Sequence, residues 1–342
     1  MKQVSLKISH NNIIVLATLL LLFILYGSGA ALYTGFFSMQ VFLNLFIDNA
    51  YLIIVATGMA FVIIKGGIDL SVASVVALIS MVSAGLFEQG ANALVVTIVA
   101  LLIGTLFGAG QGYLIQRFQL HPWIVTLAGM FLARGISFLI STESIVISNP
   151  TYVKLSQYKI HLWGDNFITI SVLVAAAVVI AAILIGRYSS FGRAVYAIGG
   201  SEKSSVLMGL PVAKTTILVY TLSGLFSAIG GVVFTLYMLS GYSLHLMGME
   251  MDAIAACVIG GILLTGGFGY MVGPTLGVLC TGIIQTIIMF QGTLSSWWTK
   301  ITIGFLLFLF MAFQRIIVMR KEKSALPSSK NKPKFENKVV NL

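Results

Sequence analysis

The sequence predicts an all-α membrane protein that crosses the bilayer about ten times, and three observations support this prediction. Of the 342 residues, 58% are hydrophobic and only 9% are charged, and the mean hydropathy is +1.02. No soluble globular domain has this balance. The apolar residues also form runs close to the roughly 20 residues that a helix needs to cross a bilayer. These runs lack the period-two alternation of strands, so we expect helices.

Ten apolar runs are candidate membrane spans. The first begins soon after Lys2 and Lys7 and is longer than the apolar region of a signal peptide, so we interpret it as a retained span. We assign residues 1–317 to one membrane domain and residues 318–342 to a basic cytoplasmic tail that we expect to be disordered. The candidate spans are 12–32, 45–64, 70–87, 92–115, 122–141, 167–186, 215–240, 251–267, 271–290 and 298–317.

The basic residues predict the orientation of these spans. If the N-terminus is inside and ten spans alternate, the only basic residues of the outside loops are Lys154, Lys159 and Lys300. This is a strong positive-inside bias, so we expect both termini in the cytoplasm. The net charge of +10 then indicates anionic lipid rather than nucleic acid as the neighbour. The inside set is Lys2, Lys7, Lys65, Arg117, Arg187, Arg193, Lys203, Lys214 and the eight basic residues from Arg315 onward.

The segment Gly66-Gly67-Ile68-Asp69-Leu70-Ser71 places an acid between two apolar spans. An ionised Asp at the centre of a membrane helix costs roughly 3 kcal/mol. At a helix start the cost is lower, because the carboxylate can accept backbone N–H groups and interacts favourably with the helix dipole. We interpret the segment as a hinge that faces protein or water, with Asp69 as a helix cap. The alternative is that Asp69 and Ser71 contact a transported substrate, and both hold if the helix start borders a cavity.

Further polar residues lie near the predicted outer ends of spans. Asp48 and Asn49 fall in the first turn of their predicted span, where they either cap the helix or line the outer mouth of a pathway. Glu250 and Asp252 lie at the start of another apolar helix, and we interpret them mainly as caps.

Two tryptophans and one arginine are further candidates. Trp297 and Trp298 are typical of an interfacial aromatic belt, with stacking on a substrate or contact with a docked protein as the alternative. Arg134 lies near the middle of a span, so it requires a neutralising neighbour or a wet cavity.

Glycine is abundant, and we interpret most glycines as residues that allow close helix packing rather than as part of a nucleotide-binding site. Gly104, Gly108, Gly110 and Gly112 lie within one apolar run, where small residues let helices approach closely. Glycine pairs at 66–67, 260–261 and 266–267 form a weak internal echo, which is typical of transporters with two halves around a central pathway.

No covalent chemistry is visible in the sequence. It contains no Gly-Lys dipeptide and therefore no phosphate-binding P-loop, and it has neither an HExxH nor a GxSxG motif. The four histidines are scattered, Cys257 and Cys280 lie in apolar runs, and no metal-ligand spacing occurs. We expect no enzyme activity, no metal and no cofactor bound by this chain.

Three long motifs resemble the permease subunits of bacterial sugar ABC importers of the ribose type. They are GGIDLSVASVVAL (66–78), FGRAVYAIGGSEKSSVLMGLPV (191–212) and MDAIAACVIGGILLTGGFG (251–269). Within that family, the galactofuranose-transporter permeases are the most similar, through DNAYLIIVATGMAFVI (48–63), TLAGMFLARGISFLIS (126–141) and GTLSSWWTKITIG (292–304).

The resemblance implies a ten-helix permease of the type II importer class in the bacterial inner membrane. Such a chain pairs with a second permease, identical or homologous, and receives a monosaccharide from a periplasmic binding protein. The expected sugar is galactofuranose or a related furanose or pentose. ATP would bind a separate cytosolic ATPase and not this chain.

The inner segment 187–214 would then be the loop that couples to the ATPase. Its Ser201 predicts a capped short helix over 204–208, which Gly209 and Pro211 end. The candidate coupling residues are Arg193, Gly199, Gly200, Glu202, Lys203 and Gly209.

Two other readings remain. A transporter driven by an ion gradient is the main alternative, but it would be expected to carry several intramembrane carboxylates or histidines. A membrane-embedded transferase is the other, and no nucleophile or metal set supports it.

Overall fold

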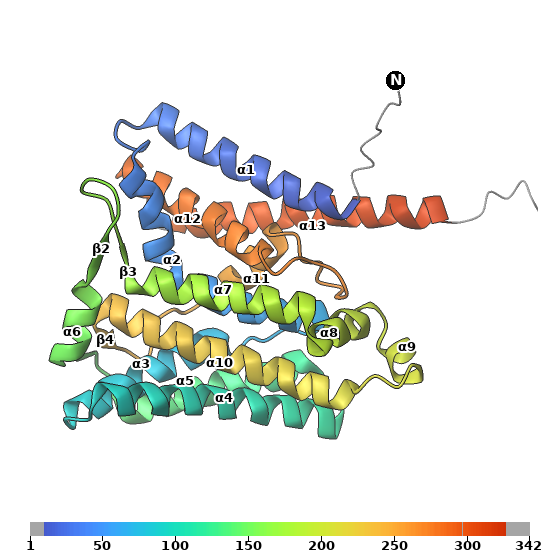
Figure 1. Cartoon of the computed structure of the whole chain (residues 1–342), viewed down its shortest axis with the longest axis horizontal. Coiled ribbons are helices and arrows are strands. Elements are labelled where there is room, and N and C mark those ends of the chain that lie inside the picture. Colours follow the sequence, from blue (N-terminus) through green and yellow to red (C-terminus); the bar gives the residue numbers. More distant parts are fainter. Residues whose placement is uncertain (1–9, 296, 326–342) are drawn as a thin grey trace, which may run out of the picture.

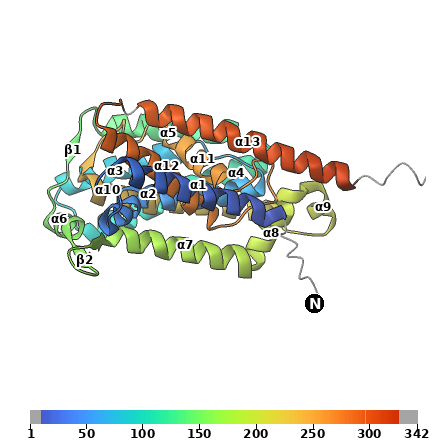
Figure 2. The ribbon, with the colours of Figure 1, turned by 90° about the horizontal axis from the view of Figure 1, so that it is seen from above.

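Membrane-length helices lie roughly parallel and form most of the molecule (Figures 1 and 2). The structure is a computed structural model that describes residues 10–295 and 297–325. Within these ranges, eight helices are long and apolar enough to cross a bilayer. They are α1 (His10–Leu32), α2 (Met39–Lys65), α4 (Ala93–Phe118), α5 (Pro122–Ile140), α7 (Ile170–Tyr188), α10 (Val212–Met238), α12 (Gly273–Gln291) and α13 (Trp297–Ala325).

Two further apolar helices are shorter than a membrane span. α3 (Val72–Glu88) has 17 residues and is mostly buried, and α11 (Met249–Ile259) has 11 residues. The predicted span 251–267 is therefore wrong in its second half. Gly260 ends α11, Gly261 adopts a φ of +92°, and the chain then runs without helix to α12. The all-α membrane fold is confirmed, whereas the number of ten spans is not.

The helix ends follow local sequence signals. The side chain of Ser38 accepts the N–H of Val41 at 3.2 Å and begins α2 well before the predicted residue 45. Gly66, with a φ of +94°, ends α2 in the left-handed conformation that favours glycine. Asn92 caps α4 by accepting the N–H of Leu94 at 2.8 Å.

α4 and α10 form the most extensive helix pair, and small residues make their contact possible. A Cβ built at Gly104 would lie 2.6 Å from the carbonyl oxygen of Gly224, and one at Gly108 would overlap the carbonyl oxygen of Tyr220. A Cβ at Gly112 would lie 2.9 Å from Ile217. The packing interpretation is confirmed for these three glycines, but Gly110 meets no described neighbour within 4 Å.

α2 is the centre of the bundle. Its residues from 52 to 64 are all buried, and it contacts α7, α10, α11 and α12. The two cysteines, Cys257 and Cys280, are free and buried in the core, as expected.

Shorter elements gather at the two ends of the bundle. α8 (Ser190–Gly200) and α9 (Glu202–Leu207) lie at the same end as the start of α1 and the end of α13 (Figure 1). The opposite end carries α6 (Pro150–Gln157) and two short antiparallel pairs, β1 (Ile145–Val146) with β4 (Ser240–Gly241) and β2 (Lys159–His161) with β3 (Phe167–Thr169). The predicted inner and outer loops thus separate, while their assignment to cytoplasm and exterior stays a prediction.

α13 continues to Ala325, past the predicted boundary at residue 318, and where the membrane domain ends stays a prediction. Lys2, Lys7 and residues 326–342 lie outside the described residues.

Candidate functional site

A cleft of about 670 Å³ lies among α2, α11, α12, α13 and the loop before α11. We call it the tryptophan cleft, because Trp297 at the start of α13 lines it. Several of its polar groups are neutral amides, hydroxyls or indole N–H groups. They belong to Asn49, Tyr51, Thr281, Gln285, Trp297 and Thr299.

One ion pair spans the wall of the tryptophan cleft. The ammonium of Lys300 on α13 lies 2.5 Å from the carboxylate of Asp252 on α11, and both side chains are partly exposed. Gly248 has no side chain and occupies the N-cap position of α11, so the cap interpretation of Glu250 and Asp252 is wrong. The pairing leaves this wall without net charge, which suits a neutral solute. The sequence placed Lys300 among the outside basic residues but did not predict it as a site residue, because nothing local connects it with Asp252.

Asn49 and Asp48 have different surroundings. α2 begins at Met39, so both residues lie about three turns inside the helix and neither caps it. Asn49 is buried, lines the tryptophan cleft, and donates to the carbonyl of Leu45 at 2.9 Å. Asp48 is exposed and accepts from the hydroxyl of Tyr237 on α10 at 3.4 Å. Of these two residues, Asn49 lines the cleft and Asp48 does not. Trp298 does not line the cleft either.

Asp69 lies in a buried junction of α3, α4 and α10, separate from the cleft. Its carboxylate accepts from Ser71 N–H at 3.0 Å, Ser71 Oγ at 2.6 Å and Ser223 Oγ on α10 at 2.7 Å. It thus satisfies an N–H at the start of α3, although Ser71 holds the N-cap position. Asp69 is only 2% exposed, and its carboxylate links the turn before α3 to α10, while its contact with a substrate stays a prediction.

The same junction explains Gly67 and involves Gln111. A Cβ at Gly67 would overlap the hydroxyl of Tyr220, so a larger residue there would require the Tyr220 side chain to shift. The side-chain oxygen of Gln111 on α4 lies 3.2 Å from Ser71 Oγ. Since the Ser71 proton goes to Asp69, reversing the Gln111 amide would let its NH₂ donate to Ser71 instead.

Arg134 on α5 finds its partners in the backbone. One guanidinium nitrogen donates to the carbonyls of Ser243 at 2.5 Å and His245 at 2.9 Å. Leu246 and Met247, which follow in the same loop, line the tryptophan cleft, and Leu246 has a φ of +57° that is uncommon outside glycine. Arg134 therefore fixes the loop that forms one wall of the cleft.

The end of the bundle opposite the cleft carries two helices where the sequence predicted one. Ser201 caps α9 by accepting the N–H of Ser204 at 3.3 Å, and Gly209 adopts a φ of +75° after the helix ends, both as expected. The preceding residues form α8, so Arg193, Gly199 and Gly200 lie in a helix.

α9 is attached to the bundle yet presents an apolar surface. Glu202 at its start pairs with Lys65 at the end of α2 at 3.3 Å. Lys203 is exposed, and the side chains of Val206, Leu207 and Met208 are exposed by 58%, 90% and 67%. An apolar tip at the end of a helix bundle is typical of a protein contact.

A polytopic helix bundle with a polar cleft at one end and a projecting helix pair at the other defines a membrane transport subunit rather than an enzyme. The chain belongs to the family described as branched-chain amino acid transport system / permease component, whose model matches residues 41–311.

Its relatives include an ABC transporter permease and import permeases for sugars. The chain is 45% identical to the inner membrane ABC transporter permease protein YjfF of Escherichia coli K12, over 86% of this chain and 90% of the relative. It is 37% identical to the fructose import permease protein FruG of Bifidobacterium longum (91% and 93%) and 33% identical to the ribose import permease protein RbsC of Bacillus subtilis (80% and 84%). No solved structure matches the chain.

Proposed function

We propose that this chain is the membrane-spanning permease subunit of an ATP-driven importer of a monosaccharide in the bacterial inner membrane. It pairs with a second permease, the tryptophan cleft receives the sugar from a periplasmic binding protein, and α8 and α9 contact a separate cytosolic ATPase. The names of the relatives support an ABC importer for sugars, since two of them are a fructose and a ribose permease.

The chemistry of the tryptophan cleft is the observation that carries the proposal. A sugar is neutral and rich in hydroxyls, and amide and hydroxyl side chains can exchange hydrogen bonds with it. The cleft offers these groups at Asn49, Thr281 and Gln285, together with the indole of Trp297. Its volume of about 670 Å³ lies within the usual range for small-molecule sites.

We also propose galactofuranose or a related furanose or pentose as the cargo. The segments 48–63 and 292–304, which carry the resemblance to galactofuranose permeases, supply Asn49, Tyr51, Trp297 and Lys300 to the cleft. The resemblance therefore includes residues that line the cleft in which we propose that the sugar binds.

Reconstitution into liposomes tests the proposal. The chain is combined with its ATPase and binding protein, and uptake of radiolabelled ribose, fructose and galactose is measured separately, galactose supplying galactofuranose as a minor ring form. We expect ATP-dependent uptake of at least one sugar that an inactive ATPase variant abolishes. Sugar uptake that does not depend on ATP would contradict the proposal.

A carrier driven by an ion gradient is the competing function. The same liposomes separate the two, because such a carrier would continue without ATP and stop when an uncoupler collapses the gradient. Among the described residues, Asp69, in the turn between α2 and α3, is the one buried acid, and its three donors already satisfy it. This arrangement favours the ATP-driven importer.

A further inference from the structure

Three glycine segments from distant parts of the chain meet where α8 touches the bundle. They are Gly66 at the end of α2, Gly199-Gly200 at the end of α8, and Gly266-Gly267 in the loop between α11 and α12. The N–H of Gly267 donates to the carbonyl of Ile64 in the last turn of α2 at 2.7 Å. The end of α2 and the loop after α11 are thus bonded directly to each other.

α8 packs onto this hydrogen bond. A Cβ built at Gly199 would overlap the carbonyl oxygen of Ile64 and lie 2.5 Å from the nitrogen of Gly267, so it would meet both atoms of the bond. Gly266 and Gly267 have φ values of +82° and +72°, and Cβ atoms there would lie 2.9 Å from Gly66 and 2.6 Å from Gly200. Only glycine satisfies both the backbone conformation and the close approach.

Other contacts hold α8 and α9 to the same two elements. The hydroxyl of Tyr196 on α8 donates to the carbonyl of Gly269 at 2.8 Å, and burial raises the pKa of Tyr196 to about 12, so the phenol keeps its proton. The ring of Phe191 on α8 lies 6.0 Å from that of Phe61 on α2. Lys65 pairs with Glu202 on α9.

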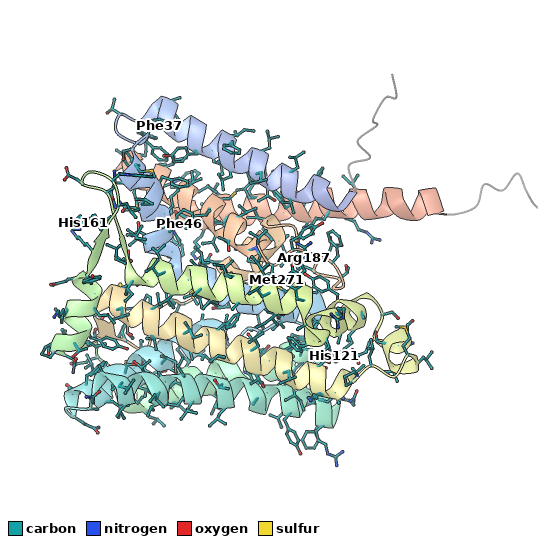
Figure 3. The ribbon with its side chains drawn as sticks, viewed as in Figure 1. Phe37, Phe46, His121, His161, Arg187 and Met271 are labelled. Atoms are coloured by element: carbon teal, nitrogen blue, oxygen red, sulfur yellow. The ribbon has the colours of Figure 1, made fainter. Side chains whose placement is uncertain are left out.

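A second cleft, of about 660 Å³, lies directly beside these contacts. α7, α8 and the loop 267–272 line it, with Arg187, Tyr196 and Met271 among its side chains. Arg187 and Met271 lie next to each other at this end of the bundle (Figure 3). The loop that bonds to α2 is therefore also a wall of a cleft at the α8 end.

The two elements joined here also form the tryptophan cleft at the other end. α2 carries Asn49 and Tyr51, and α11 carries Met249 and Asp252. A displacement of α8 that kept its contacts would move α2 and α11 together.

We propose that Gly199, Gly266 and Gly267 form a joint through which α8 moves α2 and α11 as one body, so that a force on α8 and α9 changes the exposure of the tryptophan cleft. Gly199 is the positioning residue of this joint. The proposal rests on the proposed function, because it takes the ATPase as the source of the force.

The chain itself offers a matched pair of variants. Gly199→Ala places a methyl group against the bond between Ile64 and Gly267. Gly200→Ala makes the same change one residue later, where no non-neighbouring atom of the described residues lies within 4 Å of the built Cβ. Both are Gly-to-Ala changes in the last turn of α8.

The test measures cleft exposure and needs no knowledge of the sugar. Met289→Cys places a reporter in the wall of the tryptophan cleft, and the chain without it gives the background, since Cys257 and Cys280 are buried. The reaction rate with a membrane-impermeant maleimide is measured on the assembled complex with its ATPase in nanodiscs, with and without ATP and vanadate.

We expect ATP and vanadate to change the reporter rate about tenfold, within the usual range of coupling between sites. Gly200→Ala should keep this response, and Gly199→Ala should abolish it while ATP hydrolysis stays within about twofold of the parent, because the ATPase is unchanged. A full response in Gly199→Ala overturns the joint. A reporter that does not respond even in the parent complex instead contradicts the proposed coupling to an ATPase.

A second variant keeps the test decisive if Gly199→Ala fails to assemble. Tyr196→Phe removes the hydrogen bond to Gly269 and keeps the ring, so assembly should be preserved. We expect the reporter response to fall at least about threefold with hydrolysis retained, and an unchanged response in Tyr196→Phe would overturn the joint.

Discussion

Asp252 on α11 and Lys300 on α13 face each other at 2.5 Å across one wall of the tryptophan cleft. Because both side chains are partly exposed, the pair adds at most about 1 kcal/mol to stability. Its main consequence is electrostatic, since it leaves the wall neutral where a neutral solute would pass.

Removing one member of this pair should harm transport more than removing both. Lys300→Gln leaves Asp252 as an unpaired charge, and we expect uptake per assembled transporter to fall several-fold with little change in melting temperature. Asp252→Asn combined with Lys300→Gln restores neutrality and should recover most of the uptake. If the double variant is as impaired as the single one, charge balance is not the role of the pair.

Asn49 should contribute to sugar affinity, and its neighbour provides the control. Asn49→Leu keeps the branched shape and the number of side-chain heavy atoms but removes the amide from the tryptophan cleft. We expect the sugar concentration for half-maximal uptake to rise about fivefold, the equivalent of roughly 1 kcal/mol for a lost hydrogen bond. Asp48→Asn changes a residue outside the cleft and should leave that concentration unchanged. Equal effects of the two variants would contradict the assignment of Asn49.

Asp69 should be essential for the junction of α3 and α10. Asp69→Ala leaves Ser71 and Ser223 without their acceptor, and we expect correct membrane insertion, failed uptake and a loss of stability of about 1–3 kcal/mol. Ser223→Ala removes one donor and should lower the melting temperature less. Uptake, membrane insertion and thermal unfolding in detergent check these outcomes, and normal uptake by Asp69→Ala would discard the hinge interpretation.

Arg134 should hold the loop 242–248 in place. Arg134→Leu frees the carbonyls of Ser243 and His245, so we expect faster hydrogen exchange in this loop and slower uptake by an assembled protein. Arg134→Lys should be intermediate, because an ammonium lacks the rigid fork of the guanidinium. Unchanged exchange in Arg134→Leu would show that other contacts fix the loop.

Two glycines of α4 should differ in their tolerance of alanine. A Cβ at Gly108 overlaps the carbonyl of Tyr220, whereas Gly110 meets no described neighbour within 4 Å. We expect Gly108→Ala to lower the melting temperature and the yield of folded protein. Gly110→Ala should be neutral or slightly stabilising, because alanine favours helix by up to about 1 kcal/mol over glycine. Similar melting temperatures would contradict the close packing of α4 on α10.

Much of the fold was predictable because its signals are local. Run length and hydropathy depend on about 20 consecutive residues, so each predicted span overlaps a helix of the structure. Two of these helices, α3 and α11, are shorter than a membrane span. Caps act within one helical turn, so Ser201 correctly predicted a capped short helix that ends before Gly209, although α9 covers Glu202–Leu207 rather than 204–208. The same kind of signal was missed at α2, where the Ser38 cap starts the helix at Met39 rather than at residue 45 and so places Asp48 and Asn49 inside the helix.

The sequence by itself determined the class of the molecule: a helical membrane protein with loops in two groups and no catalytic constellation. Only the tertiary structure decided which polar groups meet. Asp69 accepts a hydrogen bond from Ser223, which is 154 residues away in the sequence, and Asp252 pairs with Lys300, which is 48 residues away. The hydrogen bond between Ile64 and Gly267 also joins distant segments. The physical reason is that hydropathy and caps act along the chain, whereas these contacts depend on the rotation and depth of each helix against its neighbours, which packing alone sets.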